Sequence, residues 1–348
     1  MRLLILTQKV DSNDSALGFF HRWIIEFAKH AEKVTVICLE EGIHSLPLNV
    51  KVYSLGKEKG NSKLHYLIRF YSLIFSLRNE YDSVFVHMNQ IYVILGALLW
   101  KLWNKKIAMW YVHRQTNFSL WVSEKLADII FTSSKESFQV PSNKVQYVGH
   151  GIDSQNFVCQ GGTAENDKIN ILYVGRITAI KNLETLIDAT VLLRGDVSSL
   201  TVTCVGSAVT ESDGVYQEAL EVSIQEKNLE RVVRFKGSVS SAEIAKEYCR
   251  ATLSVNLSPT GGWDKSVLES LTAGCPVFAS NRALTPVFGE YADIFLFEQG
   301  NAKDLAQKIE AFLQNKDKDI IVKILSQNAI KKYDLGNLVS HIIDQLET

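Results

Sequence analysis

The sequence predicts an α/β protein made of two Rossmann-like domains that face each other across a cleft. Short apolar runs alternate with helical patterns along the chain, and this alternation starts again in the second half. Between the halves, Gln160–Lys168 is polar, rich in glycine and without periodicity, as in a linker. The length of 348 residues suits two domains, because single domains cluster near ~100–200 residues.

The apolar runs of the first half have the length of buried strands. The run after Met1 is too short for the apolar core of a signal peptide, so we expect a first strand and a cytoplasmic protein. From Leu17 to Ala28, apolar residues repeat with the spacing of a helix packed on a sheet. The expected strands are Leu3–Leu6, Val34–Leu39, Ser83–His87, Ile107–Tyr111, Ile129–Thr132 and Val145–Val148.

The second half repeats the pattern, with a helical stripe from Leu183 to Val191 after its first strand. We expect domains at residues 1–158 and 168–324. A helical stretch at about residues 325–348 is expected to pack back on the first domain. The expected strands are Asn170–Val174, Leu200–Val205, Val232–Lys236, Leu253–Leu257 and Val277–Ala279.

Composition excludes several classes of protein. The 37 basic and 38 acidic residues leave a net charge of −1, which argues against a general nucleic-acid binder. The 46% of hydrophobic residues argues against disorder. Five cysteines form no CxxC pair and indicate buried thiols in a reducing compartment, not a disulfide framework or a zinc site; they are Cys38, Cys159, Cys204, Cys249 and Cys275.

No segment is long enough to span a bilayer, since the apolar run Ile91–Trp100 falls short of the ~20 residues required. Two segments mix aromatic and apolar residues with Lys and Arg, namely Ser62–Arg78 and Leu98–Lys106. They are either core helices with solvated basic ends or a peripheral contact with the inner membrane surface.

Common nucleotide and metal motifs are missing. The sequence has no GxxxxGK[ST], HExxH or GxSxG. In the GxG at Gly149–Gly151 the last fingerprint glycine is replaced by Ser154, which disfavours a nicotinamide oxidoreductase. Asp317 and Asp319 lie in a Lys/Asp run typical of an exposed helix face, so we expect no metal cofactor.

Basic and glycine-rich segments of the second half suggest phosphate binding. Arg176 follows a strand and Lys181 precedes a helix, where the two cations can clamp a diphosphate. Within Ser258–Ser270, a glycine-rich turn leads into a helix whose first N–H groups can cradle phosphate, and Glu269 on that helix can accept hydrogen bonds from ribose hydroxyls. Alternatively, these are solvated surface charges.

The ordered set of segments resembles the retaining family 4 glycosyltransferases of the GT-B fold. It comprises Trp110–Gln115, Ala127–Ser137, Val148–Phe157, Gly175–Ala189, Phe235–Ile244 and Leu268–Val277. The resemblance implies transfer of a sugar from a UDP- or GDP-linked donor, which is a substrate and not a cofactor, to a hydroxyl acceptor with retention. It implies an acceptor domain followed by a donor domain, a glycan or lipid-linked acceptor, and a role in polysaccharide or glycolipid synthesis.

The resemblance also assigns roles to matching positions. Arg176 and Lys181 would bind the donor diphosphate, and His113 would lie near the transferred sugar and the acceptor. The other implied donor contacts are Gly18 on the first-strand loop, Gly237 and Ser238 at the nucleobase, Asp264, Lys265, Ser266 and Val267 at the phosphates, and Glu269 at the ribose.

Two departures from the family pattern concern the donor sugar. Gly261 replaces the first Glu of the paired-glutamate motif, so either Asp264 takes over its role or sugar selection differs. The first-strand loop lacks the usual double glycine and carries Asp11, Asn13 and Asp14 instead. A sugar-nucleotide epimerase and a non-catalytic nucleotide-sugar-binding scaffold remain as alternatives.

Overall fold

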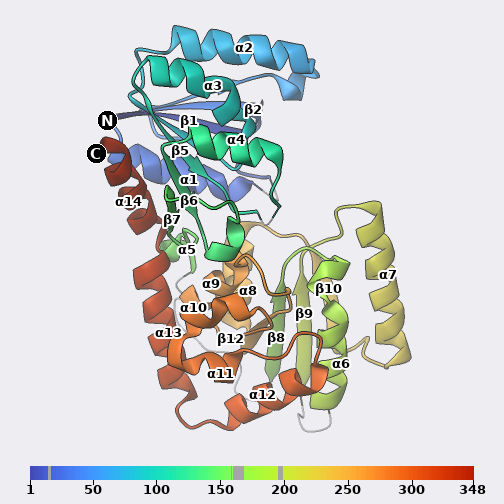
Figure 1. Cartoon of the computed structure of the whole chain (residues 1–348). Helices are drawn as coiled ribbons and strands as arrows, with labels where there is room; N and C mark the ends of the chain where they lie inside the picture. The colour runs from blue at the N-terminus through green and yellow to red at the C-terminus, as the bar shows by residue number, and fades with distance from the viewer. Residues whose placement is uncertain (15–16, 114, 158, 160–167, 195–198) are drawn as a thin grey trace. The chain divides into compact units, whose positions relative to one another are not determined.

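The computed structural model describes residues 1–14, 17–113, 115–157, 159, 168–194 and 199–348 (Figure 1). The chain forms two compact units, one of Met1–Gly151 with Leu335–Thr348 and one of Ile152–Asp334. Each is a parallel sheet with helices packed on it, which confirms the predicted α/β class with Rossmann-like halves. The expected linker at Gln160–Lys168 lies outside the described residues except for Lys168.

The described residues of the first unit form a seven-stranded parallel sheet in the order β3-β2-β1-β4-β5-β6-β7. The edge strand β3 was not predicted, because Lys51 interrupts its short apolar stretch and most of its positions are only half-buried. The strands are β1 (Arg2–Val10), β2 (Lys33–Glu41), β3 (Val50–Ser54), β4 (Ser83–His87), β5 (Lys106–Trp110), β6 (Ile129–Thr132) and β7 (Val145–Tyr147).

Helices cover both faces of this sheet, because successive strand residues point to opposite sides. Leu3 and Ile5 of β1 pack with α1 (Gly18–His30) and α14 (Leu335–Glu347). Leu4 and Leu6 pack with α2 (Lys63–Ser76) and α3 (Ile91–Leu102) on the opposite face. The helix α4 (Phe118–Leu126) packs beside α3.

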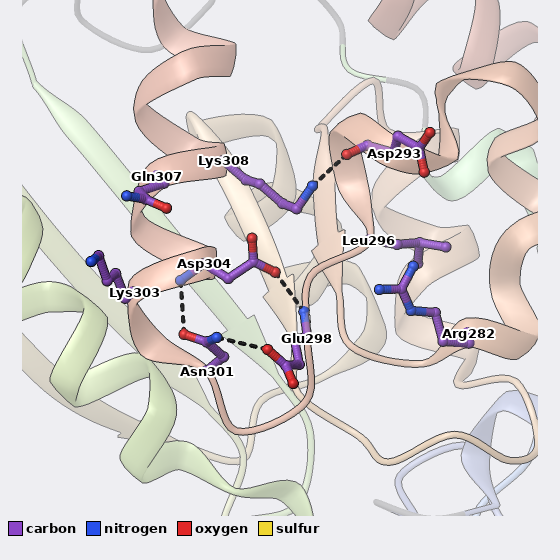
Figure 2. Close-up of a pocket in the computed structure, with 9 residues that line it drawn as sticks. All are labelled: Arg282, Asp293, Leu296, Glu298, Asn301, Lys303, Asp304, Gln307 and Lys308. Atoms are coloured by element: carbon purple, nitrogen blue, oxygen red, sulfur yellow. Dashed lines mark hydrogen bonds between the residues drawn. The ribbon is translucent and has the colours of Figure 1, made fainter.

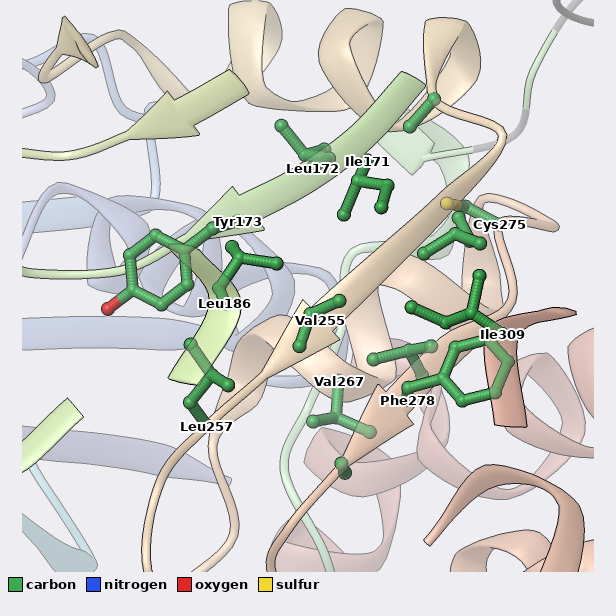
Figure 3. Packing of buried hydrophobic residues seen from close by; sticks show 14 of the residues in the cluster. Ile171, Leu172, Tyr173, Leu186, Val255, Leu257, Val267, Cys275, Phe278 and Ile309 are labelled. Atoms are coloured by element: carbon green, nitrogen blue, oxygen red, sulfur yellow. The ribbon is translucent and has the colours of Figure 1, made fainter. Parts of the chain in front are cut away.

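The second unit contains a five-stranded parallel sheet in the order β10-β9-β8-β11-β12. Its core gathers apolar side chains from the central strands and the flanking helices, among them Ile171, Val255, Val267 and Phe278 (Figure 3). The strands are β8 (Ile169–Val174), β9 (Leu200–Val205), β10 (Val233–Gly237), β11 (Leu253–Asn256) and β12 (Val277–Ala279).

The longer helices α6 to α9 each follow a strand in a βα alternation, whereas α12 and α13 both come after the last strand. They are α6 (Leu183–Leu193), α7 (Glu211–Glu226), α8 (Ser241–Arg250), α9 (Lys265–Thr272), α12 (Ala302–Gln314) and α13 (Lys318–Tyr333); α5 (Ser154–Phe157), α10 (Thr285–Phe288) and α11 (Ala292–Phe295) are short.

The expected C-terminal helix is two helices that belong to different units. The first of them, α13, packs against α9 in the second unit, whereas α14 packs against α1 in the first. The chain changes unit at Asp334, whose carboxylate accepts a hydrogen bond from Ser154 Oγ. Ile152 N also donates to Tyr333 O at 2.8 Å, so the second unit starts before and ends after the predicted 168–324.

The expectation that all five cysteines are free thiols is wrong for one pair. Cys159 and Cys249 form a disulfide across 90 residues of sequence, with Cα atoms 5.5 Å apart. A pairing over this separation leaves no local spacing signal, which is why the sequence did not reveal it. Cys38, Cys204 and Cys275 are buried free thiols. The cysteines therefore no longer indicate a reducing compartment.

Candidate functional site

Most of the predicted site residues of the second unit lie at one edge of its sheet. Because all five strands are parallel, their carboxyl ends meet at the same edge. Arg176 comes just after β8, Ser207 just after β9 and Ser258 just after β11, while Gly237 ends β10. The structure thus gathers residues that are far apart in sequence at the place where α/β sheets bind ligands.

The loops after β8 and β9 approach so closely that one position requires glycine. Gly206 has φ +136°, and a Cβ at this position would lie 1.9 Å from Gly175 O. Gly206 N donates to Gly237 O at 2.9 Å, and Ser207 Oγ lies 2.7 Å from Ser238 Oγ. The predicted nucleobase turn is therefore joined to the loop of β9, and sequence reasoning did not identify Gly206 as part of it.

Lys181 lies in a hydrogen-bonded cluster with residues from the loop after β11. Its Nζ lies 2.6 Å from Asp264 Oδ2 and 2.7 Å from Ser258 Oγ. Asn256 Nδ2 donates to the same Asp264 oxygen at 2.8 Å, and Ser258 Oγ also donates to it. Burial opposes the charge on Asp264, but the Lys181 ammonium and these hydrogen bonds outweigh it and lower the pKa of that carboxyl.

Arg176 is exposed and has a carboxylate beside it. Its Nε lies 3.6 Å from Asp213 Oδ2, and its carbonyl oxygen accepts a hydrogen bond from Tyr173 Oη at 2.9 Å. The hydroxyl of Thr178, and then that of Thr210, lowers the pKa of Asp213 to about 2. Asp213 therefore stays charged near neutral pH. The guanidinium of Arg176 is placed by its loop and faces solvent, so it is available to a ligand.

The N-terminus of α9 lies at the same edge. Asp264 is its N-cap residue, yet its side chain makes no capping hydrogen bond and turns to Lys181. Lys265 Nζ lies 2.9 Å from Glu269 Oε1 one turn further on, and Glu269 is buried. Like Arg176 and Lys181, Lys265 is thus paired with a carboxylate. Two of these pairs, Lys181–Asp264 and Lys265–Glu269, involve the N-cap residue and the first two turns of α9.

The glycine-rich loop before α9 is held in place by the loop after β12. Gly261 N donates to Asn281 Oδ1 at 3.2 Å, and Asn281 Nδ2 donates to Gly262 O at 3.0 Å. Trp263 Nε1 donates to Ala283 O at 2.9 Å. Asn281 is fully buried. Only backbone is present at Gly261, where the family pattern has its first Glu.

In the first unit, the acidic loop after β1 is organised by Lys9. Its Nζ lies 2.9 Å from Glu40 Oε1, 3.0 Å from Asp14 Oδ2 and 3.5 Å from Asp11 Oδ2, and the first two carboxylates raise the pKa of Lys9. Gly18 N donates to Asp14 O at 2.9 Å, at the start of α1. The carboxylates that replace the double glycine therefore hold the loop together.

The histidines of the first unit have different surroundings. His113, in the loop after β5, is exposed and packs edge-on against Tyr111 with ring centroids 5.6 Å apart. Partial burial lowers its pKa, so its imidazole is neutral at neutral pH. His87 is buried and stacks on Phe20 with centroids 3.7 Å apart, and burial lowers its pKa to about 3. His87 is therefore a core residue.

A polar cavity of about 680 Å³ lies on the second unit between α12 and the segment from Arg282 to Glu298 (Figure 2). Its lining groups bond to one another: Asn301 Nδ2 donates to Glu298 Oε2 at 2.8 Å, and Lys308 Nζ to Asp293 O at 2.5 Å. None of the predicted site residues lines it. Sequence reasoning did not predict this cavity.

Residues 159–332, half of the chain, match the family model described as Glycosyl transferases group 1. Sulfoquinovosyl transferase SQD2 of Arabidopsis thaliana is 23% identical over 237 residues, which cover 64% of this chain and 43% of that protein. The chain spans about half the length of the curated relatives it matches.

Two solved structures cover the whole chain. Anabaena HepE in complex with UDP is 18% identical, with a TM-score of 0.79 and complete coverage of both chains. Sucrose-phosphate synthase from Thermosynechococcus elongatus is 16% identical, with a TM-score of 0.79 and coverage of 100% of this chain and 98% of that one. Both support the GT-B fold class.

Proposed function

This chain belongs to the Glycosyl transferases group 1 family, and we propose that it transfers a sugar from a UDP- or GDP-linked donor to a hydroxyl acceptor with retention of configuration. The expectation of a glycosyltransferase is confirmed at the level of the family. The structural relative HepE was solved with UDP and with UDP-glucose, which supports a nucleotide-sugar donor for this chain.

The observation that carries the proposal is the convergence of cations and backbone donors at the carboxyl edge of the second sheet. Arg176 and Lys181 come from either end of one loop, and the first turn of α9 adds backbone N–H groups at the helix N-terminus. Two cations and a helix N-terminus suit a diphosphate, which carries several negative charges on oxygens that accept hydrogen bonds.

These groups supply what the reaction needs most. When the bond between the sugar and the diphosphate breaks, negative charge develops on the departing phosphate oxygen. Arg176, Lys181 and the α9 N–H groups would stabilise that charge in the way a divalent cation does in other transferases. We therefore propose catalysis without a metal cofactor, with the nucleotide sugar as a substrate.

Retention would follow from attack on the same face that the diphosphate leaves. The acceptor oxygen forms its bond to the anomeric carbon as the bond to the phosphate oxygen breaks, and the acceptor proton passes to that oxygen. His113, exposed and neutral, would donate a hydrogen bond to the transferred sugar or to the acceptor. Gly18 would bring the loop after β1 to the donor.

The experiment that tests the function is incubation of the protein with UDP-sugars and GDP-sugars in turn, following release of the nucleoside diphosphate. We expect slow release with one base and a faster rate with a glycan or lipid-linked acceptor. Interconversion of the sugar nucleotide without transfer would favour an epimerase. Binding without release or transfer would favour a non-catalytic scaffold, and no binding at all would refute the proposal.

Glu269→Ala is expected to raise the KM for the donor about 10-fold or more while changing kcat less. A hydrogen bond from ribose to a charged carboxylate contributes on the order of 1.5–3 kcal/mol to ground state and transition state alike. Steady-state kinetics over a range of donor concentration measures the effect. Lys265→Ala removes the 2.9 Å partner of Glu269 and reports what the pair itself contributes. An unchanged KM for Glu269→Ala would contradict the ribose role.

We further propose that the acceptor is anchored in a membrane and that the outer face of α2 and α3 rests on anionic lipid. Leu64, Ile68 and Phe75 of α2, and Leu98 and Leu102 of α3, are each more than half exposed. The two helices lie side by side, since Tyr71 Oη donates to Leu95 O at 3.1 Å. We define these five apolar residues as the α2/α3 face.

The charges around the α2/α3 face favour an anionic partner. Neither helix contains Asp or Glu, and Lys63, Arg69 and Lys101 are exposed on them. Apolar residues flanked by cations suit a bilayer with negative headgroups. Trp100 lies in the segment Leu98–Lys106, for which the sequence left a core helix and a membrane contact open; it is fully buried, with Nε1 3.1 Å from Tyr81 Oη. No helix in the described part of the chain is long and apolar enough to cross a membrane.

Flotation with liposomes tests this contact. We expect co-flotation with vesicles containing phosphatidylglycerol at low salt and little with phosphatidylcholine alone. Leu98→Ser combined with Leu102→Ser should lower binding about 10-fold or more, because each side chain contributes ~1.5–3 kcal/mol on burial. The matched control is Val215→Ser with Val222→Ser, which removes exposed apolar residues from α7. Equal flotation of both double variants would contradict the proposal.

A further inference from the structure

Asp264 makes side-chain contacts that the sequence did not reveal. Its Oδ2 accepts hydrogen bonds from Lys181 Nζ at 2.6 Å, from Asn256 Nδ2 at 2.8 Å and from Ser258 Oγ. Asn256 and Ser258 are both buried. An Asp at a helix N-cap ordinarily accepts a hydrogen bond from its own helix. Here the side chain makes no such bond. It contacts Asn256 at the end of β11, Ser258 just after it, and Lys181 in the loop between β8 and α6.

The contact fixes the position of the Lys181 ammonium. A lysine side chain is flexible and loses rotamer freedom when it is held. Two oxygens, Asp264 Oδ2 and Ser258 Oγ, hold Nζ from the side of the β11 loop. The third N–H of the ammonium remains for another acceptor. Lys181 is thus preorganised before any ligand arrives.

The same contact offsets part of the attraction that the Lys181 charge exerts on an anion. A diphosphate that approaches this ammonium also comes near the Asp264 carboxylate. The ammonium would then lie between the two anions and donate a hydrogen bond to each. Because the pair is only partly exposed, the repulsion from the carboxylate is screened less than at an open surface. The Lys181–Asp264 pair therefore offers a diphosphate a well-placed hydrogen-bond donor with less net attraction than an unpaired lysine would give.

We propose that Asp264 is a positioning residue that aims Lys181 at the donor diphosphate and at the same time limits retention of the nucleoside diphosphate product. The proposal rests on the proposed function, because it takes a nucleoside diphosphate as the ligand of Lys181. It also gives Asp264 a task other than replacing the missing Glu at Gly261. The Asp264 carboxylate affects the donor by positioning Lys181, and its negative charge speeds release of the nucleoside diphosphate product.

The test compares binding of UDP, GDP, uridine and guanosine to the full chain and to Asp264→Asn by isothermal titration calorimetry, together with steady-state kinetics. Asparagine keeps the shape and accepts hydrogen bonds through its amide oxygen but carries no charge. We expect the cognate nucleoside diphosphate to bind about 10-fold more tightly to Asp264→Asn, with affinity for the nucleoside unchanged. We expect kcat to fall because Lys181 is held less firmly and product leaves more slowly.

Lys181→Met provides a second test, which does not require Asp264→Asn alone to fold. This change leaves the Asp264 carboxylate without its cation, so nucleoside diphosphate binding should weaken. Adding Asp264→Asn should then restore part of the lost affinity. If neither Asp264 change tightens binding while the unaltered chain binds UDP or GDP, the inference is wrong and the proposed function stands. If the unaltered chain binds neither, both are wrong.

Discussion

Replacement of Lys181 by alanine is expected to reduce sugar transfer by at least about 10²-fold, and replacement of Arg176 by a similar factor. The reason is the charge that develops on the leaving phosphate, since the loss of one preorganised donor to such an oxygen typically costs ~10²–10³ in kcat. Lys181 is held by Asp264 and Ser258, which preorganises it for this task. Arg176 is more exposed, so a larger share of its effect should appear in the KM for the donor.

The measurement is steady-state transfer with the cognate donor and acceptor, with folding verified by thermal unfolding. Two variants serve as matched controls that remove the same charges from elsewhere in the second unit. Lys227→Ala breaks a pair with Asp188 at 3.4 Å, and Arg194→Ala removes a donor to Asn228 O at 2.8 Å. Neither residue belongs to the candidate site, so both controls should stay near the unaltered rate. Near-normal turnover in both single variants, Lys181→Ala and Arg176→Ala, would refute the assignment of these residues to the donor site.

Much of the fold follows from the sequence because parallel strands covered on both faces appear as short apolar runs. The strands β4, β6, β9 and β12 begin and end where the sequence predicts. The strand β3 was not predicted because it lies at the edge of the sheet and is only partly buried, so its sequence has no continuous apolar run. The division of the C-terminal helical stretch at Asp334 was not predicted. The sequences of α13 and α14 both show a helical pattern, and the two helices differ only in the unit against which they pack.

The sequence predicts those candidate site residues whose charge is unusual for their position along the chain. Arg176 and Lys181 stand out because cations at a strand end and a helix start have little structural reason to be there. Contacts across long stretches of sequence were not predictable. The Asp264 contact with Lys181 spans 83 residues, and the Cys159–Cys249 disulfide spans 90. Such pairs are defined by how the strands are ordered in the sheet, and sequence pattern does not specify that order.

Gly206→Ala is expected to lower the free energy of unfolding by more than ~2 kcal/mol. The backbone at Gly206 has φ +136°, which side chains rarely adopt and which costs on the order of 1–3 kcal/mol in a residue other than glycine. In addition, the new Cβ would lie 1.9 Å from Gly175 O, so the loops after β8 and β9 must separate. Urea unfolding of the purified variant measures the change.

Gly214→Ala is the matched control, because the same methyl group meets nothing within 4 Å there and φ is ordinary for a residue inside α7. Alanine in a helix interior is favoured over glycine by ~0.5–1 kcal/mol, so this variant should be slightly more stable than the unaltered chain. Both substitutions add one methyl group to the second unit. If the free energy of unfolding falls in Gly206→Ala and rises in Gly214→Ala, the loss of stability is due to the conformation and packing of the loop at Gly206. Because Gly175 precedes Arg176 directly, Gly206→Ala should also reduce transfer, whereas Gly214→Ala should not. Equal stability of the two variants would contradict the tight packing of these loops.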